Sequence, residues 1–241
     1  MKISESRRGG IAASLAALAL ASLVAAPVPA AAQGDENKRI NESIEVLTTL
    51  MGTPDQVIPD SILERAEAIV VIPSLVKGGF IVGAQHGKGI MSIRDRATNT
   101  WTSPGFVALT GGSFGWQIGL QGVDLVLLVM NPAGVKDLLS SEFKLGANAS
   151  VAAGPVGRSA EASTDAKVSA QILAYSRAKG LFAGLTVEGA ALRADKDANQ
   201  KFYGRGVTQD DIIKGMGAPS TDAARAWANA VKRLTPATRT N

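Results

Sequence analysis

Apolar and polar residues alternate at helical spacing near the start of the chain. A helix is predicted over residues 36–51, where Ile40, Ile44, Leu47 and Met51 recur every three or four residues. Gly52 suits the end of this helix. A second, shorter helix is predicted over residues 59–68, with Ile62, Leu63 and Ala66 facing inward.

From Ile69 onward the pattern changes to short apolar runs separated by Gly, Pro or Asn. This spacing is typical of antiparallel strands that follow one another. Residues 123–130 are continuously apolar, which predicts a central strand covered on both faces. A helix is predicted to follow, with Asn131 as its cap and Pro132 in its first turn.

Residues 144–163 are rich in Gly, Ala and Ser and carry few bulky side chains. Apolar residues occupy every second position from Leu145 to Ala153, which predicts one half-buried strand. A turn at 154–158 and a return strand over 158–163 are expected next. Small side chains allow another layer of the protein to approach closely.

The last third of the chain predicts a hairpin and three helical segments. The hairpin is expected to turn at Lys179–Gly180, and its second strand to run over 181–194. A helical turn capped by Asp197 follows, and then a capping box formed by Thr208 and Asp211. The final amphipathic helix, over 220–234, carries Trp227. Together these patterns predict the α+β class, with one antiparallel sheet-rich core and flanking amphipathic helices.

The N-terminus has the pattern of a secretory signal peptide. Positive residues come first, an Ala-rich apolar run spans 11–28, and small residues at 30–32 precede an expected cut before Gln33. We therefore expect a periplasmic or secreted protein. The expected organisation is a signal peptide (1–32), an N-terminal helical segment (33–55), the main domain (56–215), and a C-terminal helix and tail (216–241).

Composition excludes several functions. The net charge of the chain is +4, and the signal segment supplies +2 of it, so the remainder argues against nucleic acid as a partner. The chain has no Cys and one His, which rules out thiolate and imidazole-rich metal sites. No cofactor is expected.

Two motifs suggest chemistry at first sight. Residues 111–115 match G-x-S-x-G, the nucleophile elbow of hydrolases, around Ser113. The residues that follow alternate like a strand, and His86 precedes the serine, whereas the hydrolase order places it after. Residues 195–199 start like a calcium loop, but Gln200 and Gly206 occupy the positions that need glycine and a carboxylate.

Basic residues near predicted turns are the candidate binding site. Arg grips a phosphate with two hydrogen bonds, and Lys acts as a point charge. If several of these side chains converge, they would hold an anionic headgroup. The candidates are Lys77, Arg158, Lys167, Arg177, Lys179, Lys201 and Arg205.

Seven segments in series resemble the SYLF domain family. They are "IPDSILERAEAIVVIP", "GGFIVGAQHGKGIM", "WTSPGFVALTGGSFGWQIGLQ", "VDLVLLVMN", "LGANASVAAGPVGRSAEAS", "YSRAKGLFAGLTVEGA" and "KDANQKFYG". The resemblance covers residues 56–215.

This resemblance implies a lipid-binding module without catalytic residues. In eukaryotic members the domain binds phosphoinositides with the help of an amphipathic helix at its start, and some members bind actin. The matching helix here is 59–68, with 40–51 as an addition, but its acidic residues would be repelled by an anionic membrane. Actin is not an expected partner of an exported protein.

The leading hypothesis is a non-catalytic module of the cell envelope that binds a phospholipid or a membrane surface. The alternative is a structural protein of the envelope that binds a protein partner through a sheet face or the Trp227 helix. A serine hydrolase using Ser113 is the remote alternative.

Overall fold

The computed structural model describes residues 34–52, 57–115, 120–138, 143–156, 170–177, 187, 189–215 and 221–235. The expected signal peptide lies outside these residues, as do the expected return strand over 158–163 and the expected turn at Lys179–Gly180. The side chains of residues 78–82, 113–115, 120–121 and 136–137 are also not described.

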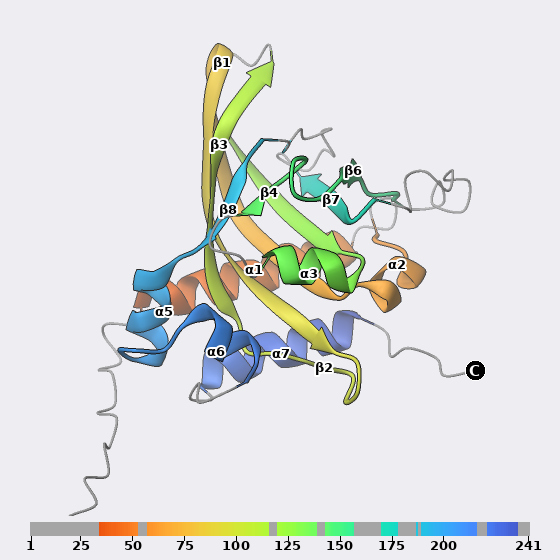
Figure 1. Cartoon of the computed structure of the whole chain (residues 1–241), viewed down its shortest axis with the longest axis vertical. Helices are drawn as coiled ribbons and strands as arrows, with labels where there is room; N and C mark the ends of the chain where they lie inside the picture. Colours follow the sequence, from red (N-terminus) through yellow and green to blue (C-terminus); the bar gives the residue numbers. More distant parts are fainter. Residues whose placement is uncertain are drawn as a thin grey trace, which may run out of the picture.

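The chain forms one mixed sheet with helices around it (Figure 1). The helices are α1 (Gly34–Gly52), α2 (Asp60–Arg65), α3 (Pro132–Leu138), α5 (Lys196–Tyr203), α6 (Gln209–Ile213) and α7 (Asp222–Leu234). The strands are β1 (Ala68–Asp95), β2 (Thr100–Trp101), β3 (Gly105–Gly115), β4 (Leu120–Val129), β5 (Phe143–Lys144), β6 (Val151–Ala153), β7 (Ile172–Arg177) and β8 (Ala191–Ala194). The α+β class is confirmed.

The sheet has the strand order β5-β8-β3-β1-β4-β7-β6, with β2 paired to β1 off this path. All but one of the strand pairs are antiparallel, and β6 pairs with β7 in parallel. The predicted antiparallel sheet-rich core is confirmed, with one parallel pair at the β6 edge.

Strand β1 folds back on itself. Its first part pairs with β4 and its later part with β3, both antiparallel. The Arg94 amide donates to the Glu67 carbonyl at 2.8 Å, and a side chain on Gly89 would overlap the backbone of Val71. Figure 1 shows β1 rising from the body of the molecule and returning from its far end. Pro73 does not end the strand: the pairing of β1 with β4 shifts its register between Ile72 and Leu75 and then continues.

The two edges of the sheet are connected by a short segment, so the sheet curls. β5 and β6 stand at opposite ends of the strand order, yet only the six residues 145–150 separate them. Six residues span at most about 20 Å. The Leu145 amide donates to Ala190 beside β8, and the Ile172 amide of β7 donates to Ser150.

This segment corrects the prediction of one continuous strand from Leu145 to Ala153. Turn residues 146–148 interrupt it, with Gly146 at φ 84°, and only Val151–Ala153 form a strand beyond them. Apolar residues alternate both before and after this turn, so the alternation alone does not predict where the strand is interrupted.

The turn of the predicted hairpin and most of the first half of its second strand lie outside the described residues; where both strands are described, they do not pair with each other. β7 pairs with β4 and β6, whereas β8 pairs with β3 and β5, on the other side of the sheet. β8 is described only from Ala191 to Ala194.

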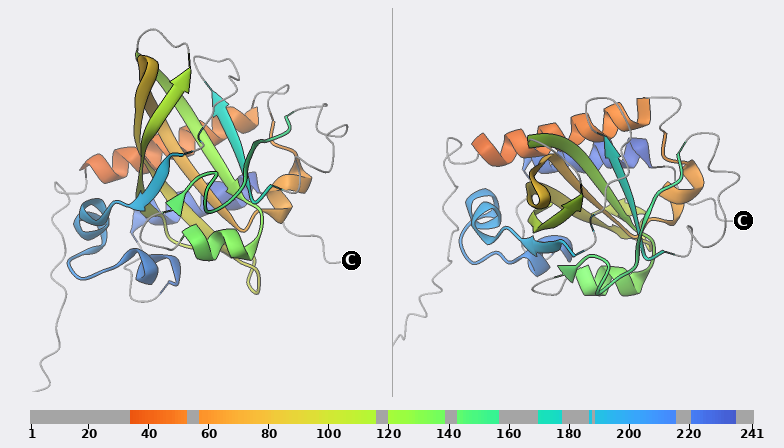
Figure 2. Two further views of the ribbon diagram at one scale, coloured as in Figure 1. Left: turned by 45° about the horizontal axis from the view of Figure 1, so that its top comes forward. Right: turned by 90° about the horizontal axis from the view of Figure 1, so that it is seen from above.

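Both faces of the sheet are packed. On the outer face, α1, α2, α5 and α7 cover residues such as Ile69, Val71 and Phe106 (Figure 2). On the inner face, a second cluster of apolar side chains joins Val70 and Ile72 of β1 to Leu145 and Ala149, in the segment between β5 and β6, and to Leu138 of α3. β4 lies between β1 and β7 and is buried on both faces from Leu125 to Val129, as its sequence predicts.

The predicted C-terminal helix is confirmed as α7, but its Trp227 side chain is buried. Trp227 has no exposed surface, and its indole N–H donates to the Ser92 hydroxyl. The apolar face of this helix is therefore part of the core, and the Trp227 side chain is not available to a partner.

Candidate functional site

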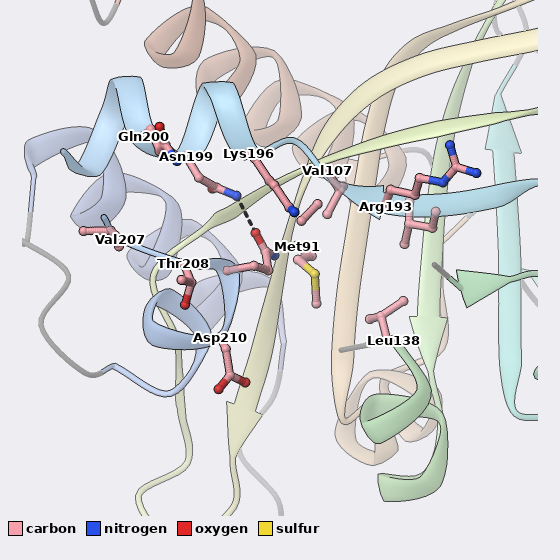
Figure 3. Close-up of a pocket in the computed structure, with 13 residues that line it drawn as sticks. Met91, Val107, Leu138, Arg193, Lys196, Asn199, Gln200, Val207, Thr208 and Asp210 are labelled. Atoms are coloured by element: carbon pink, nitrogen blue, oxygen red, sulfur yellow. Dashed lines mark hydrogen bonds between the residues drawn. The ribbon is translucent and has the colours of Figure 1, made fainter. Parts of the chain in front are cut away.

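A cleft of about 580 Å³ opens where β3 and β8 meet α5, α6 and the end of α3 (Figure 3). The floor of the cleft is apolar and comes from four elements: Met91, Val107, Leu138 and Leu192. Clefts that bind small molecules have about this size, with an apolar lining and a few polar groups.

The wall of the cleft is fixed by the side-chain amide of Asn199 in α5. Its Oδ1 accepts from the Phe106 amide at 2.8 Å, and its Nδ2 donates to the Phe106 carbonyl at 3.3 Å. The same Nδ2 donates to Oε1 of Gln209 in α6 at 2.6 Å. Asn199 is 1% exposed, so one buried side chain holds α5 and α6 against β3.

Two basic side chains stand at the junction of β8 and α5. Figure 3 shows the Lys196 ammonium directed toward Met91 and Val107, whereas the Arg193 guanidinium projects away from the cleft. Both residues also line a shallower hollow of about 410 Å³ on the outer face, beside Lys88 and Ala108. A cation thus stands above an apolar floor.

Asp195, between these two residues, is held in place by the fold. Its Oδ2 accepts from Arg39 at 3.0 Å and lies 3.6 Å from the Lys88 ammonium, and its Oδ1 accepts from the Ala198 amide. Burial raises the pKa of Asp195, but the Ala198 amide, Arg39 and Lys88 outweigh it and hold the pKa below its ordinary value. Asp195 is the cap of α5, which corrects the prediction of Asp197.

The structure separates the candidate basic residues that it describes. Lys77 is 5% exposed on the inner face of β1, and burial lowers its pKa. Arg177 lies two positions after Tyr175 in β7 and therefore on the same, outer face of the sheet. Its guanidinium forms an ion pair with Asp124 at 2.8 Å. Lys201 and Arg205 are exposed on and after α5. Arg158, Lys167 and Lys179 lie outside the described residues.

The residues that line the cleft were not singled out from the sequence. In the sequence, Asp195 and Lys196 belong only to the start of an incomplete calcium loop, and Arg193 falls within the strand predicted over 181–194. Nothing local marks Met91, Val107, Leu138 and Leu192 as neighbours, because they meet only after the sheet has curled.

Ser113 does not stand at a strand-to-helix turn. It lies within β3, opposite Gly83 of β1, and the strand continues to Gly115. His86 pairs with Thr110, three positions along the same strand, which is about 10 Å away. His86 lies within β1 and is exposed.

The described ranges contain no group of three His, Asp or Glu side chains arranged to hold a metal ion. Among the helices in those ranges, none is both long and apolar enough to span a membrane.

A family model described as "Ysc84: Las17-binding protein actin regulator" matches residues 110–234. The chain is 40% identical over 170 residues to "LAS seventeen-binding protein 3" of Saccharomyces cerevisiae, which covers 68% of this chain and 36% of the yeast protein. It is 33% identical over 189 residues to "SH3 domain-containing YSC84-like protein 1" of Xenopus laevis, covering 77% of this chain and 54% of that protein.

The protein with the same name in Homo sapiens is 31% identical over 192 residues, covering 78% of this chain and 55% of the human protein. The match therefore spans about a third to about half the length of these relatives.

Proposed function

The chain belongs to the Ysc84 family, the SYLF family that its motifs resemble, and from this premise we propose that it is a non-catalytic module of the cell envelope that binds a phospholipid in the cleft. The observation that carries the proposal is the placement of Lys196 above the apolar floor of Met91, Val107, Leu138 and Leu192. An amphiphile with an anionic headgroup would place its headgroup at the Lys196 ammonium and its acyl chain on the apolar floor.

The polar side chains of the cleft belong to the binding role. Asn199 bonds the backbone of β3 at Phe106 and donates to Oε1 of Gln209, which holds the wall in place before a ligand arrives. A site whose shape is fixed in advance loses less entropy on binding. Thr208 and Asp210 lie on the α6 side of the same cleft, where they can bind glycerol or headgroup hydroxyls.

The proposal is tested with short-chain phosphatidic acid below its critical micelle concentration, titrated into the purified protein by calorimetry. Lys196→Glu should weaken binding by tenfold or more, because it reverses the charge above the floor. Lys201→Glu is the matched control, since Lys201 is exposed on the same helix and does not line the cleft. Equal affinities of the two variants, or no binding by the unmodified protein, would refute the cleft as the lipid site.

A protein partner is the second candidate, and the printed names of the relatives favour it. One relative is named as a binding protein of LAS seventeen, and the family description names an actin regulator. The outer face of the sheet is exposed at His86 and Lys88, beyond the helices that pack on this face, and such a partner would bind there. A defined complex in light scattering, formed equally well by Lys196→Glu, would favour this candidate over the lipid.

A further inference from the structure

The hollow of about 410 Å³ lies on the outer face of the sheet, where β1, β3 and β8 run side by side. The strand register builds it: Lys88 of β1 lies opposite Ala108 of β3, and Ala108 lies opposite Arg193 of β8. Neighbouring strands are about 4.8 Å apart, so the backbones of Lys88 and Arg193 stand about 10 Å apart. Two long basic side chains thus flank a single methyl group.

Both basic side chains project from the outer face. Ile90, two positions after Lys88, packs in the outer apolar cluster. Leu192, next to Arg193, packs in the inner cluster, and successive side chains of a strand point to opposite faces. Figure 3 shows the Arg193 guanidinium directed away from the cleft, in agreement with this alternation.

The Lys88 side chain reaches across β3. Its ammonium lies 3.6 Å from Oδ2 of Asp195, which follows β8 on the other side of β3. Arg39 donates to the same oxygen at 3.0 Å, and Oδ1 of Asp195 accepts from the Ala198 amide. Asp195 therefore keeps two partners when the Lys88 ammonium, whose side chain is 54% exposed, turns to a ligand.

The hollow is lined mainly by charged side chains. Arg39 compensates one of its two carboxylates from beneath, which leaves the basic side chains in excess. Thr110, two positions after Ala108 in β3, adds a hydroxyl, and the apolar residues of the lining are Ala108 and Ala194. The charged residues of the lining are Lys88, Arg193, Asp195, Lys196 and Asp197.

We propose that the hollow binds the phosphoryl group of a phosphate monoester, with Lys88 and Arg193 on either side of it. A guanidinium holds a phosphoryl group with two hydrogen bonds, an ammonium acts as a point charge, and the Thr110 hydroxyl can donate a further hydrogen bond. Because the lining holds no bulky apolar side chain, it suits a polar ester. The phosphoryl group can belong to a soluble compound or to a lipid headgroup whose acyl chains lie outside the hollow.

The hollow and the cleft are separate sites, although Arg193 and Lys196 line both. Lys88, Ala108 and Thr110 line the hollow and not the cleft. Variants at these three positions therefore test the hollow alone, and the proposal does not depend on a lipid in the cleft.

Glycerol 3-phosphate, titrated into the purified protein by calorimetry, is the soluble probe, and glycerol is its uncharged control. Ala108→Glu should weaken binding at least tenfold, because it places a carboxylate between Lys88 and Arg193. Ala84→Glu, at an exposed position of the same face of β1, adds the same charge outside the hollow and should bind like the unmodified protein. Lys88→Gln, which removes one of the two flanking charges at an exposed position, should weaken binding about tenfold.

His86 gives a local readout, because it is the only histidine of the chain. It lies two positions from Lys88 on the same face of β1, opposite Thr110. The NMR signal of its imidazole Cε1 proton should shift when glycerol 3-phosphate is added at constant pH. The shift should be absent in Ala108→Glu.

Vesicles of phosphatidylcholine that contain phosphatidic acid distinguish the two sources of the phosphoryl group. If the protein binds these vesicles and not glycerol 3-phosphate, and Ala108→Glu but not Ala84→Glu abolishes the binding, the phosphoryl group belongs to a lipid. If glycerol 3-phosphate binds with the expected dependence on Ala108, a soluble ester is sufficient.

Three results would overturn the proposal: binding of neither probe, binding that Ala108→Glu leaves unchanged, or a tetra-aspartate peptide that binds as tightly as glycerol 3-phosphate. Ala108→Glu should preserve any dependence of phosphatidic acid affinity on acyl length, since Ala108 does not line the cleft. Failure at the hollow is thus distinct from failure at the cleft.

Discussion

The indole N–H of Trp227 donates to the hydroxyl of Ser92 at 2.6 Å, and the Ser92 hydroxyl donates in turn to the Thr102 carbonyl at 3.0 Å. Trp227 and Ser92 are both fully buried and 135 residues apart in the sequence. The pair joins α7 to the later part of β1. Because buried polar groups are costly when they lose a partner, this hydrogen bond fixes where the C-terminal helix lies.

Ser92→Ala should lower the free energy of unfolding by about 1–3 kcal/mol, because it leaves the buried Trp227 N–H without its acceptor. Urea denaturation followed by circular dichroism measures the change. Asn229→Ala, at an exposed position of the same helix, is the control and should shift stability by less than about 0.5 kcal/mol. Unchanged stability of Ser92→Ala would show that water replaces the serine.

Gly154→Ala should destabilise the protein by about 1–3 kcal/mol, because the new methyl group would overlap the ring of Tyr175. Gly122→Ala is the matched control, since nothing lies within 4 Å of that position. In a Tyr175→Ala background the penalty of Gly154→Ala should disappear. A penalty that persists without the ring would place its cause in the backbone.

Asn199→Asp should destabilise the protein by about 2–4 kcal/mol, because a carboxylate cannot donate to the Phe106 carbonyl or to Gln209. The buried charge adds to the loss of both donors. Gln200→Ala changes the exposed neighbour and should be neutral. Thermal unfolding at neutral pH compares the three proteins, and an unaffected Asn199→Asp would mean that α5 does not need this contact.

The sequence predicted those elements whose signals are local. The capping box of Thr208 and Asp211 is present, as is the cap that Asn131 provides to Gly134. Helices α1 and α7 follow their apolar spacing. In each case the residues that make the signal also make the contact.

Pairing between distant strands could not be predicted in this way. An alternating pattern says that a strand has a buried face but not which strand lies beside it, so β7 and β8 were assigned to one hairpin. For the same reason the cleft could not be predicted: Met91 and Leu138 become neighbours only through the curl of the sheet. The positions of the basic residues near turns gave no information about the face on which each would lie.

The contribution of Asp195 to stability should depend on pH. Its pKa in the folded protein is held below the ordinary value, so its ion pairs stabilise the fold above the unfolded pKa of about 3.9. This stabilisation is lost as the pH falls through the lower, folded pKa. Asp195→Asn keeps a cap for α5 but removes the charge, and should cost about 1–2 kcal/mol at pH 7.

The stability difference between wild type and Asp195→Asn should therefore shrink toward zero in acid, as measured by urea denaturation from pH 7 down to pH 2. Asp197→Asn, at an exposed position of the same helix, controls for the loss of a carboxylate. A difference that stays constant with pH would assign the effect to the cap rather than to Arg39 and Lys88.

The cleft should discriminate phospholipids by acyl length. Each methylene buried against Met91, Leu138 and Leu192 contributes about 0.8 kcal/mol, or roughly fourfold in affinity. A series of soluble phosphatidic acids should therefore bind more tightly as the chain lengthens, until the volume of about 580 Å³ is filled. Calorimetry should also give a negative heat-capacity change, the mark of apolar burial. Affinity that ignores chain length would mean that only the headgroup is bound, with Lys196 acting at the surface and the apolar floor taking no part.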